Sequence, residues 1–366
     1  METNSNNIPE ITVCDLVNQL KNLYVKATKA GIDYKKLPTP FLWGPAGIGK
    51  SEGIYQLAEA LEKETLKKVI VTDIRLLLFS PVDLHGIPVA DEGRRFAKWL
   101  MPSVFNMDSS EDIINILFLD ELSAAPQSVQ AAAYQICLDR RVGEHKLADN
   151  CIIIAAGNRT TDMSVSYKMP KALCNRLLHF LIKVDFASWK EWAIKNDVDS
   201  RVIGYLSFDN SRLFVFPNSS DLAYPTPRSW NFVSNLLKTT ELPPEEIHDL
   251  IASAVGVDSA VEFESWCKML GKLPKIDDII KGQCLTYPTG YDVYYALVSS
   301  LTSAVISRKD SLSDTEFENV CVYAERFPLE FAVTFFRELN MIDELKGRLM
   351  KCAALSRWLI KNKKSL

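Results

Sequence analysis

The octapeptide Gly44–Ser51, GPAGIGKS, constrains this chain more than any other segment. It matches the pattern GxxxxGK[ST], follows the apolar run Phe41–Trp43 and precedes a helical stretch from Glu52 to Lys63. Glycines let successive backbone N–H groups curl around a phosphate, the lysine reaches the outer phosphates, and the hydroxyl binds magnesium. An ordinary glycine-rich turn is the alternative, and the strand–loop–helix context argues against it. The predicted nucleotide-binding residues are Gly44, Pro45, Ala46, Gly47, Ile48, Gly49, Lys50 and Ser51.

A second segment joins an apolar run to two carboxylates. The run Ile116–Leu119 is followed directly by Asp120 and Glu121. At the end of a strand in a P-loop protein, the first carboxylate would hold Mg²⁺ through water, and the second would orient or deprotonate the attacking water. An acidic pair at the surface is the alternative, and the P-loop upstream favours the functional interpretation. We therefore predict Ser51 and Asp120 as metal residues and Glu121 as a catalytic residue.

Short apolar runs alternate with helical stretches between Leu37 and Asp185. The runs are Phe41–Trp43, Val69–Thr72, Ile113–Leu119, Cys151–Ala156 and Phe180–Val184. Continuous apolar runs of this length are typical of strands that are buried on both faces of a parallel sheet. After Asp185 the strand signal fades, and the chain reads mainly as helices. The pattern predicts an α/β fold with helices on both faces of a parallel sheet, followed by helical layers.

The order of five segments resembles that of one family. GPAGIGKS, LFLDEL, AAGNR, ALCNR and TPRSW follow one another as in AAA+ ATPases, and the chain looks most like the MoxR-like branch, a helix-2-insert clade that includes the dynein-related AAA group. The resemblance covers roughly residues 37 to 237. It implies a P-loop NTPase that hydrolyses ATP to ADP and phosphate with Mg²⁺. Together with the residue pattern outside that range, it predicts four parts: an N-terminal helical segment over 1–36, an ATPase domain over 37–196, a connection and all-helical lid over 197–275, and a C-terminal helical region over 276–366.

The resemblance also implies roles by position. Asn158, after the Cys151–Ala156 run, matches the catalytic polar residue called sensor 1, and Arg176 matches an arginine finger that reaches into a neighbouring subunit's site. An asparagine at a strand-to-loop turn and a cation at a helix end are the plainer alternatives. Arg140 is a second candidate for a contact across a subunit interface, with a surface salt bridge as the alternative.

The pair Thr226-Pro227 has the chemistry of a helix N-cap followed by a first helical position, so Arg228 falls in the first turn of a helix. A cation there opposes the helix dipole unless an anion lies in front of it. The family's sensor 2 role, in which the arginine contacts nucleotide phosphate, resolves this conflict. A solvated arginine is the alternative. We add Arg228 to the predicted nucleotide-binding residues.

Two segments have hairpin character. Residues 86–90 and 94–99 flank Asp91-Glu92-Gly93, a turn signal, and residues 141–147 surround Gly143. They resemble the helix-2 and pre-sensor insertions of this AAA+ clade, which face the pore of a ring or a partner. Simple surface ribbons are the alternative.

Composition narrows the classes of function. The 366 residues carry a net charge of -4, which argues against a surface that coats nucleic acid. The start METNSNN lacks the apolar core of a signal peptide, and no apolar run approaches the length of a membrane span. The eight cysteines are scattered, as in proteins with reduced, packed thiols. We expect a cytoplasmic protein without a membrane partner.

The predicted function is that of an ATP-driven ring, a hexamer, that remodels or activates a protein partner. MoxR-like ATPases commonly work with von Willebrand factor A-domain proteins, so the resemblance implies a partner of that kind. A nucleic-acid-associated AAA+ motor or restriction-type NTPase is the alternative, disfavoured by the net charge. A nucleotide-binding switch with little turnover is a third possibility, and the Asp120–Glu121 pair weighs against it.

Overall fold

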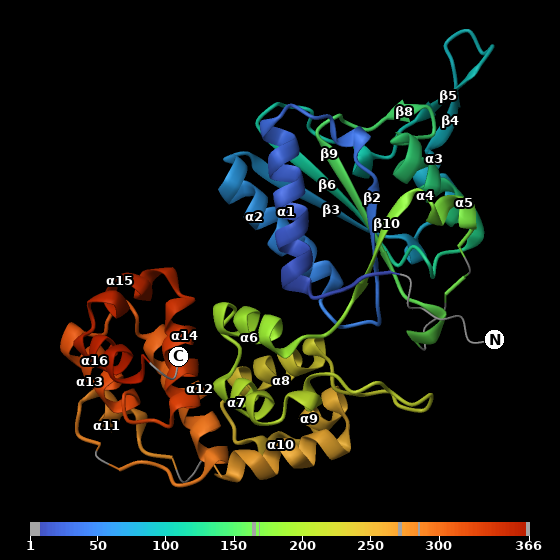
Figure 1. The fold of residues 1–366 in the computed structure, drawn as a ribbon. Coiled ribbons are helices and arrows are strands. Elements are labelled where there is room, and N and C mark those ends of the chain that lie inside the picture. The colour runs from blue at the N-terminus through green and yellow to red at the C-terminus, as the bar shows by residue number, and fades with distance from the viewer. Residues whose placement is uncertain (1–7, 163–165, 168, 270–272, 285, 364–366) are drawn as a thin grey trace. The chain divides into compact units, whose positions relative to one another are not determined.

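The computed structural model describes residues 8–162, 166–167, 169–269, 273–284 and 286–363 (Figure 1). The chain divides into two compact units, Met1–Asp185 and Phe186–Leu366. The first unit contains a parallel β-sheet with helices, and the second is helical.

The first unit is built on a six-stranded sheet in the order β1-β10-β2-β9-β6-β3, and every pairing in it is parallel. All five predicted strands are present, which confirms the α/β prediction. The run predicted as Phe180–Val184 starts earlier and ends sooner, because its pairing with β2 begins at Leu177 opposite Thr39. The short strand β1 was not predicted, since two residues carry no periodicity. The strands are β1 (Glu10–Ile11), β2 (Thr39–Trp43), β3 (Lys68–Arg75), β6 (Ile113–Asp120), β9 (Cys151–Gly157) and β10 (Leu177–Ile182).

Helices cover both faces of this sheet (Figure 1). Leu117 and Leu119 of β6 pack in one core cluster with Val129 and Ile136 of α4. The alternate residues of β6 are buried as well, under the face covered by α1 and α2. Burial on both faces explains why these strands read as continuous apolar runs. The helices of this unit are α1 (Val13–Lys29), α2 (Lys50–Thr65), α3 (Pro81–His85), α4 (Gln127–Asp139) and α5 (Lys171–Cys174).

Both predicted hairpins form. The first pairs β4 (Ile87–Ala90) with β5 (Ala97–Leu100), and it projects from the unit in Figure 1. The second pairs β7 (Arg141–Val142) with β8 (His145–Lys146). The two are tied together, because His145 Nε2 donates to the backbone carbonyl of Trp99 at 2.6 Å. Short 3-10 helices complete the unit: η1 (Tyr34–Lys36), η2 (Leu76–Leu78), η3 (Ser103–Phe105) and η4 (Thr160–Asp162).

The described regular structure of the second unit consists of helices joined by loops, as predicted. At the start of α8, the Thr226 side chain accepts from the backbone N–H of Ser229, and Pro227 is the first helical residue, which confirms the predicted cap. None of the described helices of either unit is long and apolar enough to cross a membrane. The helices are α6 (Phe186–Lys195), α7 (Ser200–Phe208), η5 (Asn210–Leu213), α8 (Pro227–Thr240), η6 (Pro244–Ile247), α9 (His248–Val255), α10 (Val257–Met269), α11 (Ile276–Ile280), α12 (Tyr291–Ser307), α13 (Asp314–Ala324), α14 (Leu329–Asn340), α15 (Asp343–Lys351) and α16 (Ala353–Asn362).

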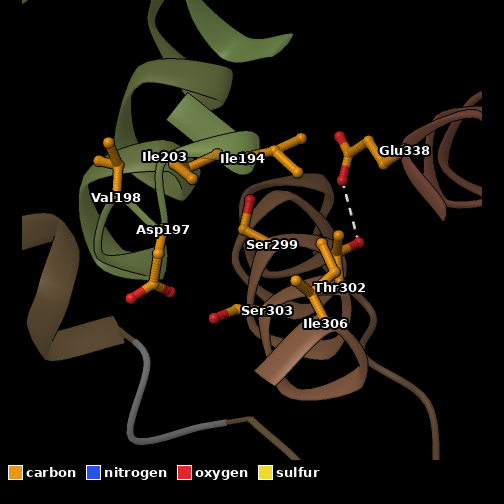
Figure 2. Close-up of a pocket in the computed structure, with 9 residues that line it drawn as sticks. All are labelled: Ile194, Asp197, Val198, Ile203, Ser299, Thr302, Ser303, Ile306 and Glu338. Carbon is orange, nitrogen blue, oxygen red and sulfur yellow. Dashed lines mark hydrogen bonds between the residues drawn. The ribbon is translucent and has the colours of Figure 1, made fainter. Parts of the chain in front are cut away.

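The second unit also holds a small cavity among α6, α7, α12 and α14 (Figure 2). Its volume is about 20 Å³, which is room for about one water molecule. The buried Ser299 hydroxyl lines it and has no hydrogen-bond partner within the described part of the chain. Beside it, Glu338 accepts from Thr302 at 2.9 Å and pairs with Lys190 at 2.6 Å. A cavity of this size cannot hold a nucleotide.

Candidate nucleotide-binding site

The P-loop connects the end of β2 to the start of α2. Gly47 and Gly49 have φ of 78° and 98°, a left-handed conformation that favours glycine. At Gly44 a Cβ would lie 2.6 Å from the Cδ1 atom of Ile48, so no larger residue fits without a shift. Gly49 is the N-cap of α2 and supplies no side-chain hydrogen bond to the first turn. The loop therefore leaves the backbone N–H groups of that turn to an anion.

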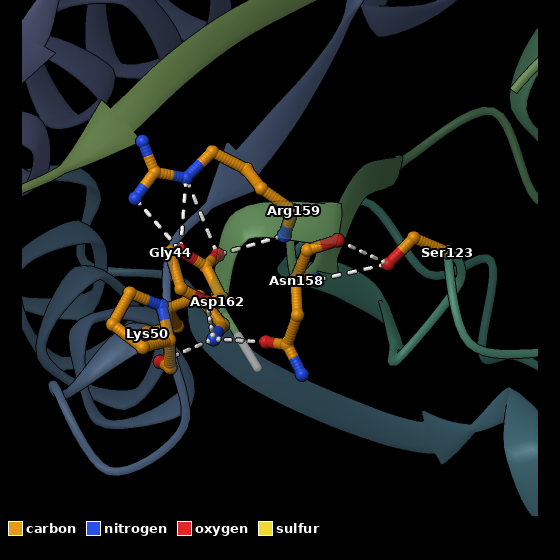
Figure 3. Close-up of polar contacts among 7 residues, drawn as sticks. Gly44, Lys50, Ser123, Asn158, Arg159 and Asp162 are labelled. Atoms are coloured by element: carbon orange, nitrogen blue, oxygen red, sulfur yellow. Dashed lines mark hydrogen bonds and ion pairs between the residues drawn. The ribbon is translucent and has the colours of Figure 1, made fainter. Parts of the chain in front are cut away.

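Lys50 joins the P-loop to a strand far away in the sequence (Figure 3). Its buried ammonium donates to the carbonyls of Gly44 and Pro45 at 2.5 and 2.8 Å, and to Oδ1 of Asn158 at 3.0 Å. Asn158 is the first residue after β9, which lies between β2 and β6 in the sheet. The structure thus brings two predicted site residues, 108 positions apart, into direct contact.

Ser51 and Asp120 form the second contact of the site. The Ser51 hydroxyl donates to Oδ2 of Asp120 at 3.0 Å, and the Glu121 backbone N–H donates to Oδ1 of Asp120 at 2.8 Å. A hydroxyl and a carboxylate are the oxygen ligands that Mg²⁺ prefers. Among the described residues no group of three or more His, Cys, Asp or Glu gathers as a metal cage. The pair fits a Mg²⁺ ion that takes its other ligands from phosphate and water.

Glu121 follows β6 in a tight turn. Its φ is 57°, the left-handed region that a glutamate seldom adopts. Its carbonyl accepts from the N–H of Ala124 at 3.0 Å, and the N–H of Leu122 donates to the carbonyl of Ala156 in β9 at 2.9 Å. These bonds offset a strain of about 1–2 kcal/mol. They tie the turn that carries Glu121 to the strand that precedes Asn158.

Ser123 belongs to the site, although sequence reasoning missed it. Its hydroxyl donates to the Asn158 carbonyl at 2.8 Å and accepts from the Asn158 N–H at 2.9 Å. The side chain is almost fully buried, and a Cβ on Gly157 would lie 2.5 Å from its oxygen. A lone serine among alanines gives no sequence signal, so only the structure reveals this tether of Asn158.

A second support for Asn158 comes from the next residue. The Arg159 side chain and backbone N–H both donate to the buried Asp162 carboxylate, with a shortest ion-pair distance of 2.7 Å (Figure 3). This closes the short turn after the strand. The spacing of three residues between opposite charges is a signal that could have been read from the sequence.

Asp73, near the end of β3, is a third carboxylate near Asp120 and Glu121. Partial burial raises the pKa of Asp73 above its ordinary value, the Asp120 carboxylate raises it further, and the Arg75 guanidinium partly opposes the shift. The sequence could have indicated this carboxylate, because Asp73 directly follows the predicted strand Val69–Thr72, as Asp120 follows Ile116–Leu119. The structure therefore adds a carboxylate to the acidic edge of the site.

Arg176 lies at the amino ends of the parallel strands, whereas the P-loop lies at their carboxyl ends. It directly precedes β10, whose first residue pairs with Thr39, whereas the P-loop begins five residues after Thr39, directly after the end of β2. That length of strand spans about 16 Å. The side chain is exposed and has no hydrogen-bond or ion-pair partner in the residues described. Arg176 therefore cannot reach its own P-loop, and its predicted action in trans remains untested.

Arg140 directly follows the last residue of α4. Its guanidinium donates to the backbone carbonyls of Cys151 and Tyr34, at 2.5 and 2.8 Å, rather than to a carboxylate. The alternative of a surface salt bridge is therefore not what the described residues show, because α4 ends where two carbonyls need a donor, and the contact across a subunit interface stays a prediction. Arg228 is exposed at the second position of α8 in the second unit, so its contact with nucleotide stays a prediction.

No protein-family model matches this sequence, and no curated protein matches it. Solved structures with similar folds include PCH-2 from C. elegans, with 15% sequence identity, coverage of 72% of this chain and 71% of that chain, and a TM-score of 0.36. A RuvB mutant from Thermotoga maritima has 15% identity, coverage of 80% and 84%, and a TM-score of 0.33. NtrX from Brucella abortus in complex with ATP has 13% identity, coverage of 97% and 69%, and a TM-score of 0.33. Similarity at this level carries no argument about function, which rests on the contacts described above.

Proposed function

We propose that this chain is a Mg²⁺-dependent ATPase of the AAA+ class, which hydrolyses ATP to ADP and phosphate. One observation carries the proposal. The Lys50–Asn158 and Ser51–Asp120 contacts gather four residues from three separate segments at the carboxyl edge of one parallel sheet. A phosphate-binding loop, a metal pair and a polar residue for the water are the parts that phosphoryl transfer to water needs.

In this mechanism the ammonium of Lys50 binds the outer phosphates, and the Ser51 hydroxyl and Asp120 carboxylate would hold Mg²⁺. Bound there, the metal would supply positive charge to offset the charge developing on the transferred phosphoryl group. Glu121 accepts the proton of the attacking water as general base. Asn158 orients that water, and its own backbone is fixed by the two hydrogen bonds to Ser123.

We further propose that the active form is a ring, a hexamer, in which Arg176 completes the site of the neighbouring subunit. Its exposed side chain and its place away from its own P-loop support this role. Arg228, in the first turn of α8, would approach the phosphates as a second sensor. Its exposed guanidinium has no described partner that would neutralise it at this helix end.

The finer proposal is a MoxR-like ring that remodels a protein partner, for example a von Willebrand factor A-domain protein. The motif order supports it, together with the projecting β4–β5 hairpin. That hairpin exposes apolar side chains, Ile87 at 61% and Phe96 at 70%, which is unusual for a segment that contacts only water. A pull-down with a hydrolysis-deficient Glu121→Gln variant would capture such a partner, and recovery of DNA instead of protein would favour a nucleic-acid motor.

The deciding experiment is ATP binding to the Lys50→Ala variant, measured by calorimetry. We expect binding to be lost, because the outer phosphates lose their direct cation. Lys63→Ala is the matched control, since Lys63 is an exposed lysine at the other end of the same helix, and it should bind ATP as the wild type does. Unchanged affinity in Lys50→Ala would show that this loop is not the nucleotide site.

A further inference from the structure

A chain of hydrogen bonds runs from the strand before the P-loop to the segment that carries Arg176. The indole N–H of Trp43 donates to Nδ1 of His179 at 2.9 Å, and Nε2 of His179 lies 2.8 Å from the carbonyl of Cys174. Trp43 ends β2, His179 lies within the neighbouring strand β10, and Cys174 ends α5. The two bonds therefore connect three elements of the first unit.

The partners of His179 fix its tautomer. An indole nitrogen can only donate and a carbonyl can only accept. Nδ1 of His179 must therefore be the bare nitrogen, and Nε2 must carry the proton. Both ring nitrogens are satisfied in the neutral imidazole, and no other tautomer makes both bonds. The ring acts as a fixed spacer between Trp43 and Cys174.

Aromatic packing holds this spacer in place. The His179 and Trp43 rings stack with their centroids 6.0 Å apart and an interplanar angle of 24°. Phe41, fully buried, packs against both rings, with centroid distances of 4.4 Å to Trp43 and 5.9 Å to His179. Because this packing restricts the orientation of the His179 ring, the ring can hold its two hydrogen-bond partners at a fixed separation.

Each end of the chain of bonds meets a residue of the proposed mechanism. Trp43 directly precedes Gly44, whose carbonyl accepts from the Lys50 ammonium. Cys174 lies two residues before Arg176, whose backbone N–H donates to the carbonyl of Leu173 at 2.8 Å. The last carbonyls of a helix lack partners within it, so the imidazole N–H satisfies one that α5 would leave open.

We propose that His179 is a positioning residue that fixes Arg176 relative to the P-loop strand of its own subunit. The inference rests on the proposed ATPase function and on Arg176 acting in trans. Since β2 carries the P-loop and α5 leads into Arg176, the imidazole couples the geometry of one subunit's site to the arginine that this subunit offers to its neighbour. His179 itself touches no phosphate.

The test uses the full-length chain with His179→Leu, which removes both bonds, and His179→Gln, which retains an N–H donor. Uniform His179→Leu rings should hydrolyse ATP about 10²-fold more slowly, as for a displacement of about 1 Å in a catalytic group, while ATP affinity stays near the wild-type value. His179→Gln should recover part of that loss. Trp43→Phe, which keeps an aromatic ring and removes the N–H donor, should lower the hydrolysis rate less than His179→Leu does.

Subunit mixing separates positioning of Arg176 from damage to the subunit's own site. A His179→Leu subunit has an intact site but a misplaced arginine. Mixed with Lys50→Ala subunits, which have an intact arginine and no site, it should regain activity. Mixed with Arg176→Ala subunits it should not, since neither kind then offers a usable arginine. Exchange of labelled subunits is confirmed first.

Three outcomes would overturn the proposal. They are wild-type turnover of His179→Leu, rescue by Arg176→Ala subunits in place of Lys50→Ala subunits, and no rescue by either although circular dichroism shows folded protein. Should His179→Leu fail to fold, the same mixtures with Trp43→Phe decide. The control mixture of Lys50→Ala with Arg176→Ala distinguishes a failure of the trans role of Arg176 from a failure of the His179 proposal. If that control mixture stays inactive, Arg176 does not act in trans. If the control mixture regains ATPase activity but the His179→Leu mixtures do not behave as expected, only the role of His179 is refuted.

Discussion

The tether between Ser123 and Asn158 gives a quantitative prediction. Replacing Ser123 by alanine removes two hydrogen bonds, of 2.8 and 2.9 Å, from a side chain that is 1% exposed. A buried donor and acceptor without partners cost about 1–3 kcal/mol. Asn158 is only half-buried, so water can satisfy part of this loss, and we expect the lower half of that range. Urea unfolding should show the decrease.

The same substitution should slow hydrolysis more than it weakens ATP binding. Ser123 holds the backbone of Asn158, and a displacement of about 1 Å in a group that orients the water costs on the order of 10²-fold in rate. Phosphate release and calorimetry measure the two effects separately. Ser253→Ala is the control, because that exposed hydroxyl bonds only within its own helix, to Asp249. Turnover equal to the wild type in folded Ser123→Ala would refute the positioning role.

Three more predictions concern the acidic edge of the site. Because the pKa of Asp73 is raised by burial and by Asp120, the folded state favours the protonated acid, and stability is lost as pH rises from the ordinary pKa through the raised one. Asp73→Asn should therefore have a higher Tm than the wild type at pH 7, and the difference should vanish in acid. A constant difference across that range would contradict the assignment. Glu121→Gln should bind ATP and Mg²⁺ but hydrolyse about 10²–10⁴-fold more slowly. Glu121→Gly should be as inactive yet more stable by about 1 kcal/mol, since glycine tolerates the φ of 57°. A glycine variant less stable than Glu121→Gln would mean that the left-handed turn is not strained.

Features that depend on neighbouring residues could be predicted from the sequence alone. The P-loop is one, because the left-handed glycines and the start of α2 lie within eight residues. The Thr226 cap and the turn at Asp91 are others, since each bond joins residues at most five positions apart. Strands that are buried on both faces of the sheet have continuous apolar sequences, so five strands were predicted from the sequence and are present in the structure. Local hydrogen bonds and periodicity are properties of a short segment, and a segment displays them wherever it lies.

Tertiary structure alone decided which of these segments meet. Any of the five apolar runs could pair with any other, and only the order β10-β2-β9-β6-β3 brings Asn158 beside Lys50. The same register sets His179 opposite Phe41, where its ring accepts a hydrogen bond from Trp43, 136 residues away in the sequence. Arg140, for which a surface salt bridge was the alternative to an interface contact, donates instead to the carbonyl of Tyr34, 106 residues away. Parallel pairing joins residues through long connections, and neither partner's local sequence records the other.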